Sequence, residues 1–186
     1  MTRWEGLFAD LEQQWCAQAR RELDAEVADR TRAERGAIGL ASRLAAAGPD
    51  PVEVALCTGL RLAGQVVDVG DGWVLVEVAG LAPTPCLVPL AAITSVAGLG
   101  RRATARGPAR RFGLGYALRG LSRNRAVVSL ADLGGGSAVG TIDAVGADVL
   151  ELAEHPADVT RRPENITGRR LVPFAALALV RPAWRG

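Results

Sequence analysis

The sequence predicts an α+β fold that is mainly β, with two tandem five-stranded β-barrels, each preceded by a helix, the first of them long. Two observations predict this fold: a repeated pattern of strand and turn residues, and a long amphipathic segment near the N-terminus. The predicted domains are an N-terminal amphipathic helix (1–48), a first barrel (49–98), an arginine-rich linker with a short helix (99–125) and a second barrel (126–182).

The N-terminal segment, from Trp4 to about Ala47, has no proline and is rich in residues that favour helices. An unbroken helix of this length would reach roughly 65 Å, well beyond one small barrel; a break at Gly36 and Gly39, leaving a short second helix, is the alternative. We expect its apolar stripe to be covered by a second subunit, or otherwise by the chain's own second barrel. The residues of this predicted self-association stripe are Trp4, Phe8, Leu11, Trp15, Leu23 and Val27.

Two stretches of the sequence occur twice in the same order. Residues 64–70 (GQVVDVG) return at 140–146 (GTIDAVG), and residues 87–93 (LVPLAAI) return at 171–177 (LVPFAAL). The second copy is longer, and its extra residues fall in the charged segment 157–168, as expected of a surface loop. This arrangement predicts an internal duplication.

Each copy shows the alternation of β-branched and polar residues that is typical of short, half-buried strands. Five strands in about 50 residues, closed so that no long edge is exposed, predict a small barrel. The predicted strands lie near 52–57, 61–69, 73–79, 84–88 and 92–96 in the first copy, and near 126–131, 137–145, 148–154, 168–172 and 176–181 in the second.

Residues 101–125 contain eight arginines and no acidic residue. The first part, with Gly107 and Pro108, is typical of a linker, whereas residues 112–124 place apolar side chains on one face and predict a short helix. Eight guanidinium groups could neutralise several phosphates. The hypothesis of nucleic-acid binding rests on Arg101, Arg102, Arg106, Arg110, Arg111, Arg119, Arg123 and Arg125. The alternative is a solvated linker whose arginines pair with acidic side chains of the barrels and of the N-terminal helix.

The stretch LCTGLRLAGQV at residues 56–66, with AITSV at 92–96, resembles the Sm-like (LSm) family, in particular its bacterial Hfq branch. The resemblance covers residues 52–96 and, more weakly, 126–181, and it implies Sm-like or SH3-like barrels in which the fourth strand of one barrel pairs with the fifth of the next. The lysine-histidine pair of Hfq is replaced by Leu90-Ala91 and Phe174-Ala175, so no RNA-binding residue carries over. The whole chain is also similar to a group of actinobacterial proteins of unassigned function.

Catalytic and metal sites are not predicted. Three cysteines without a CxxC pair and a single histidine argue against a disulfide framework, a zinc site or a bound cofactor. His155 is expected to be an exposed loop residue. The acids Asp68, Asp71, Asp143 and Asp148 are expected at hairpin turns, where aspartate accepts local backbone hydrogen bonds.

The N-terminal residues lack the pattern of a secretory signal, and no apolar run is long enough to span a membrane, which predicts a cytoplasmic protein. The functional expectation is a non-enzymatic regulatory protein that binds RNA or DNA. The alternative is a protein-interaction or scaffolding module that self-associates and does not bind nucleic acid. The expected partners are therefore RNA or DNA and further copies of the chain, with no membrane and no small-molecule substrate.

Overall fold

The computed structural model describes residues 18, 20–21, 23–32, 36, 38–80, 82–100, 102–104 and 112–183. The chain divides into two compact units, Met1–Gly39 and Leu40–Gly186.

In the first unit, residues 23–32 are helical, and Ile38 and Gly39 are not. A helix that continues through Gly39 is therefore wrong, and the alternative of a break in this glycine-containing segment followed by a short second helix is confirmed: α2 (Leu40–Leu44) is a separate helix of five residues. The stripe residues Trp4, Phe8, Leu11 and Trp15 lie outside the described residues.

The second unit contains ten strands, four short helical turns or helices, and one longer helix, α3, among its described residues. The helical elements are α2, η1 (Leu90–Ala92), α3 (Leu114–Arg123), η3 (Pro163–Asn165) and η4 (Phe174–Ala176). The strands are β1 (Val52–Leu56), β2 (Arg61–Val69), β3 (Trp73–Val78), β4 (Thr84–Pro89), β5 (Ile93–Ala97), β6 (Val127–Asp132), β7 (Ser137–Val145), β8 (Val149–Glu154), β9 (Gly168–Pro173) and β10 (Leu177–Pro182). The positions predicted for the ten strands and for the short helix are confirmed to within one or two residues.

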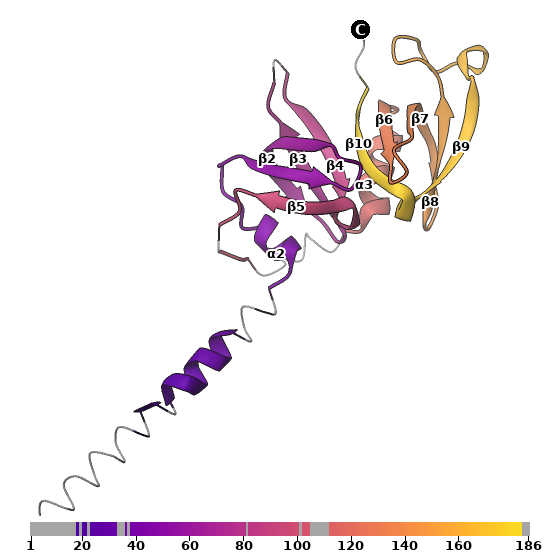
Figure 1. Cartoon of the computed structure of the whole chain (residues 1–186). Helices are drawn as coiled ribbons and strands as arrows, with labels where there is room; N and C mark the ends of the chain where they lie inside the picture. Colours follow the sequence, from indigo (N-terminus) through magenta and orange to yellow (C-terminus); the bar gives the residue numbers. More distant parts are fainter. Residues whose placement is uncertain are drawn as a thin grey trace, which may run out of the picture. The chain divides into compact units, whose positions relative to one another are not determined.

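All ten strands belong to one antiparallel sheet, in the order β5-β1-β2-β3-β4-β10-β6-β7-β8-β9 (Figure 1). The prediction of two closed five-stranded barrels is wrong, because β4 does not close onto β5 of its own half. It pairs instead with β10, where Leu87 lies opposite Val180. The sheet is open, with β5 and β9 as its end strands. An internal duplication of a closed barrel is likewise not supported.

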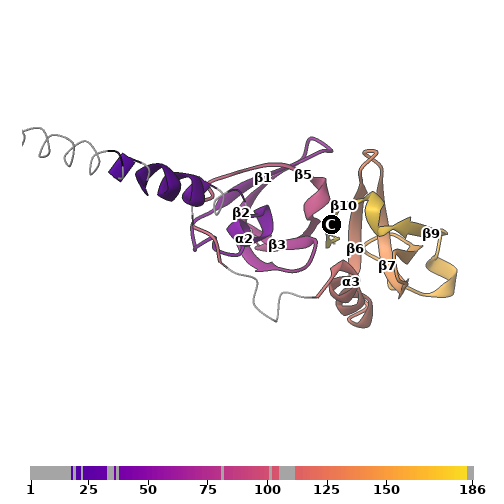
Figure 2. The same cartoon turned by 90° about the horizontal axis from the view of Figure 1, so that it is seen from below.

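The sheet encloses two hydrophobic cores, one in the half from α2 to β5 and one in the half from α3 to β10. Each core takes side chains from the other half. Leu179 of β10 packs into the first core, whereas Trp73 and Leu87 of the first half pack into the second core. Figure 2 shows α3 on the second half and α2 on the first. The junction between β4 and β10 is thus a continuous apolar layer rather than a contact between two finished domains.

Trp73 stabilises this junction through a hydrogen bond of its indole N–H as well as through the packing of its ring. Its indole Nε1–H donates to the carbonyl oxygen of Phe112 at 2.9 Å, and the same oxygen accepts from the backbone N–H of Asp71 at 3.0 Å. The ring lies so close to Gly70 that a Cβ there would stand 2.1 Å from the indole. The start of α3 is therefore attached to the β2–β3 turn of the other half.

Close strand approach also explains two glycines of the repeated pattern. A Cβ on Gly64 would lie 2.1 Å from the carbonyl oxygen of Glu77, and one on Gly140 would lie 2.0 Å from that of Ala153. In both cases the obstacle is backbone, which cannot rotate away. Only glycine fits at either position without displacing the neighbouring strand.

We predict opposite effects for two glycine-to-alanine substitutions. Gly140→Ala should lower the free energy of unfolding by about 2 kcal/mol or more, because the new methyl group meets the backbone of β8. Gly120→Ala, inside α3, where the new Cβ has nothing within 4 Å beyond its chain neighbours and the backbone of its own helix, should raise it by about 0.5–1 kcal/mol. Urea denaturation of both variants and the parent measures the difference, and equal midpoints would contradict the assigned contact.

Candidate functional site

The most unusual polar feature of the described residues lies in the middle of β7, at Asp143. The pairing register of β7 with β8 shifts between Ile142 and Ala144, which leaves Asp143 as the extra residue of a β-bulge. A bulge redirects the side chain it contains. The Asp143 side chain is only 11% exposed, and it does not lie at a hairpin turn as predicted from the sequence.

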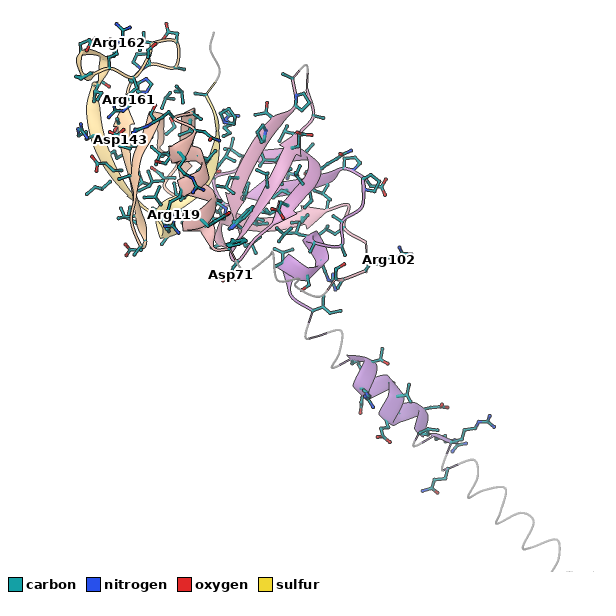
Figure 3. All side chains as sticks on the ribbon, turned by 180° about the vertical axis from the view of Figure 1, so that it is seen from behind. Asp71, Arg102, Arg119, Asp143, Arg161 and Arg162 are labelled. Carbon is teal, nitrogen blue, oxygen red and sulfur yellow. The ribbon has the colours of Figure 1, made fainter. Side chains whose placement is uncertain are left out.

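Three arginines from three separate segments converge on this carboxylate. Arg161 binds it in a bidentate manner, with Nε at 2.6 Å from Oδ1 and Nη2 at 2.6 Å from Oδ2 (Figure 3). Arg125 and Arg169 each approach an oxygen to 3.4 Å. Arg169 also donates to Glu151 at 2.9 Å. Paired forks of this kind are strong and directional ion pairs.

The arginines change the acidity of the carboxyl group. The hydrogen bond from Arg161 lowers the pKa of Asp143 most; partial burial opposes this, and the charges of Arg161, Arg169 and Arg125 lower it further. In return, the hydrogen bond to Asp143 raises the pKa of Arg161. Asp143 is therefore ionised at neutral pH, and the cluster holds the loop between β8 and β9 against β7.

A second polar contact fixes the start of the same loop. His155 is 2% exposed, and its Nε2 lies 2.9 Å from Oγ1 of Thr141, itself 1% exposed. Its Nδ1 lies 2.8 Å from the carbonyl oxygen of Pro156. A carbonyl can only accept, so Nδ1 carries the hydrogen, and in the neutral ring Nε2 accepts from the threonine hydroxyl. The predicted exposed loop histidine is therefore wrong.

Beside these contacts lies a pocket of about 330 Å³. It is lined by Arg125, Val127, Thr141, Val159, Thr160 and Arg161. Two of the Asp143 partners thus form part of its wall, and the hydroxyl-bearing Thr141 links it to His155.

The backbone of Arg125 has a φ of +50°, a left-handed conformation that no other non-glycine residue adopts in the part of the chain that the structure describes. It directly follows the C-cap of α3, where glycine usually occupies such a conformation. An arginine at this position costs roughly 1 kcal/mol relative to glycine. The guanidinium group of Arg125 is one of the three cations at Asp143.

The other notable surface is the edge of the sheet at β9. Leu171 is 69% exposed, more than any other large hydrophobic side chain among the described residues. It pairs with Glu151 of β8, just as Leu87 of β4 pairs with Leu75 of β3. Leu87, however, is 5% exposed, because β10 and the second core cover it. Leu171 thus occupies a position whose counterpart in the first half is covered by another strand.

The predicted nucleic-acid interface stays a prediction. Four of its residues, Arg101, Arg106, Arg110 and Arg111, lie outside the described residues. The other four do not form one face. Arg102 lies near α2, since the backbone N–H of Thr104 donates to the carbonyl oxygen of Ser42 in that helix. Arg119 and Arg123 are exposed on α3 (Figure 3). Arg125 is paired with Asp143 rather than free.

Of the self-association stripe, Leu23 and Val27 are described, and both are exposed, at 59% and 57%. They lie four residues apart in the helical segment 23–32 and so share one face of it.

Sequence reasoning missed Asp143, Arg161 and Leu171. Two signals in the sequence did point toward the cluster. The second copy carries a longer charged loop, which contains Arg161, and it has Asp143 where the first copy has Val67. The bulge that brings the two together follows only from the register of β7 and β8.

The described residues contain no group of three or more His, Cys, Asp or Glu side chains that could hold a metal ion. Within the same residues, none of the helices has both the length and the apolar character needed to cross a lipid bilayer. Comparisons of the chain with protein-family models, with curated proteins and with solved structures found no match. The resemblance to the Sm-like family therefore stays a prediction.

We predict that Asp143→Asn lowers the free energy of unfolding at pH 7 by about 1–3 kcal/mol, since it removes the charge that three arginines share. Because the folded-state pKa of Asp143 lies below the ordinary aspartate value of about 3.9, its stabilisation is complete above that pH. It disappears as the pH falls below 3.9 through the folded-state pKa.

Denaturation of parent and variant between pH 7 and pH 2.5 should therefore show a difference that shrinks at the acid end. Asp148→Asn is the matched control, because Asp148 makes no ion pair in the described part of the chain. A gap between parent and Asp143→Asn that stays constant with pH would rule out the charge as its cause.

Proposed function

We propose that this protein is a non-enzymatic interaction module that assembles with further copies of itself by strand addition at the open edge β9. The observation that carries the proposal is Leu171, an exposed leucine at the position where Leu87 of β4 is covered by β10. An unpaired edge strand presents free backbone N–H and C=O groups, to which another strand can add.

The strand that we expect to add is β5 of a second copy. β5 is the other end of the sheet, and it pairs with β1 as β10 pairs with β6. Val96 of β5 lies opposite Val54, as Val180 of β10 lies opposite Leu130. A contact between β9 of one copy and β5 of the next joins two different surfaces, so it generates a ring or an open filament rather than a two-fold dimer.

The residues around Leu171 favour a reversible association. The outer face of the first half offers Trp73, Leu75 and Leu87 to the second core. At the corresponding registers the second half offers Val149, Glu151 and Leu171. The polar residue in this row, Glu151, keeps the free edge soluble. It also makes the affinity between two copies lower than that of β4 for β10 within the chain.

A nucleic-acid-binding function has less support, since the described arginines of the predicted interface, from Arg102 near α2 to Arg119 on α3, do not share one face. The exposed pair Leu23 and Val27 offers a second apolar surface for assembly. It belongs to the separate N-terminal unit, so its contribution can be measured independently.

We predict that Leu171→Asp abolishes self-association, because a carboxylate cannot be buried against another strand without a partner charge. Light scattering across a concentration series should show masses above one chain for the parent and the mass of one chain for the variant. Val67→Asp is the matched control: Val67 is 56% exposed on the inner strand β2, so its substitution should leave the mass unchanged.

The double variant Leu23→Asp, Val27→Asp tests the helical segment in the same series. If it alone becomes monomeric while Leu171→Asp still associates, the edge plays no part and the proposal fails. A parent protein that has the mass of one chain at every concentration also overturns it.

A further inference from the structure

The pocket between Arg125 and the β8–β9 loop has the composition of a binding site for a small anion. Its walls combine two guanidinium groups, those of Arg125 and Arg161, with two threonines and two valines. Its volume of about 330 Å³ lies at the lower end of the range for ligand pockets. A ligand for this space is a small one.

The charges around the pocket do not balance. Arg125, Arg161 and Arg169 bring three positive charges, and among the described residues Asp143 and Glu151 are the acids that bind them. The cluster therefore has an excess of one positive charge beside a partly buried pocket. A ligand with one negative charge would neutralise it.

The two arginines of the pocket also have donors to spare. Arg161 uses Nε and Nη2 for Asp143, and Arg125 contributes a single contact at 3.4 Å. A guanidinium group has five N–H donors, and in the described part of the chain the remaining donors of these two side chains meet no protein acceptor. Their planar forks match the two oxygens of a carboxylate.

The position of Arg125 gives an independent reason to look for a ligand. Its left-handed backbone, at a φ of +50°, is a strained choice immediately after α3, where glycine would be relaxed. Its side chain is 63% exposed, and its one ion pair within the described part of the chain is the 3.4 Å contact to Asp143, which offsets little of that strain. Strained positions of this kind are often associated with binding.

The lining residues other than the two arginines favour one class of anion over another. Val127 and Val159 provide apolar surface, and buried Thr141 has its hydroxyl bonded to His155. A phosphate monoester carries close to two negative charges at pH 7, more than the excess at the cluster, and gains nothing from valine side chains. A short aliphatic acid carries one charge and has an apolar tail.

We propose that this pocket binds a small aliphatic monocarboxylate. Its carboxylate lies between Arg125 and Arg161, and its alkyl chain lies against Val127 and Val159. No residue that lines the pocket belongs to β9, and the site does not depend on self-association.

The test is a titration of the full-length chain, at constant ionic strength, with butyrate, its neutral analogue butyramide, acetate and inorganic phosphate. Binding is followed through the backbone amide resonances. Butyrate should give saturable shifts at residues 125, 141 and 159–161, acetate and phosphate should bind more weakly, and butyramide should give no saturable shift.

Arg125→Gln should weaken butyrate binding by about tenfold or more, the effect of losing one charge-assisted contact. Arg123→Gln is the matched control, because Arg123 is exposed on α3 and does not line the pocket. A second variant separates binding from folding: Arg125→Gly relieves the backbone strain, so it should melt no lower than the parent while binding butyrate as weakly as Arg125→Gln.

Three results would overturn the proposal. The first is the absence of saturable shifts with butyrate at the pocket residues. The second is binding of phosphate or butyramide at least as tight as that of butyrate, which would exclude an aliphatic carboxylate as the ligand class. The third is unchanged butyrate affinity in Arg125→Gln.

Discussion

The rest of the structure depends on the junction of β4 with β10. Neither hydrophobic core is complete without it, since Leu179 crosses into the first core and Trp73 and Leu87 cross into the second. Small domains bury little surface for their chain length, so even these few side chains from the other half add to each core. The hydrogen bonds to Phe112 then fix the direction in which the chain leaves the linker and enters α3.

The junction also explains why the two ends of the sheet differ. β10 directs Leu179 into the neighbouring core, whereas β5 has Ser95 at the corresponding register, opposite Ala55. β4 directs Leu87 into a core, whereas Leu171 of β9 faces solvent. The inner strands β4 and β10 thus carry side chains that are permanently buried. The end strands β5 and β9 carry side chains that water can solvate.

In the second half, the bulge residue Asp143 has a large structural effect. The bulge at Asp143 places a carboxylate among cations from the end of α3, from the β8–β9 loop and from β9. In the first half Val67 takes the corresponding place, exposed and without a charge partner. The longer loop of the second half is therefore held by a specific ion pair, and this ion pair borders the pocket.

The sequence by itself determined the elements: the ten strands, their turns and the short helix after the linker lie where alternation, glycine and proline place them, because these are local preferences of the backbone. Only the tertiary structure decided which strands pair, and hence that the two predicted barrels are one open sheet. The backbone groups of β4 can bond equally well to β5 or to β10. Burial of Leu87 and Leu179 favours the pairing of β4 with β10. The same holds for Asp143 and His155, which were predicted to be ordinary surface residues. Their side-chain partners are 14 to 26 residues away in the sequence, and only the register of β7 and the return of the β8–β9 loop bring them together.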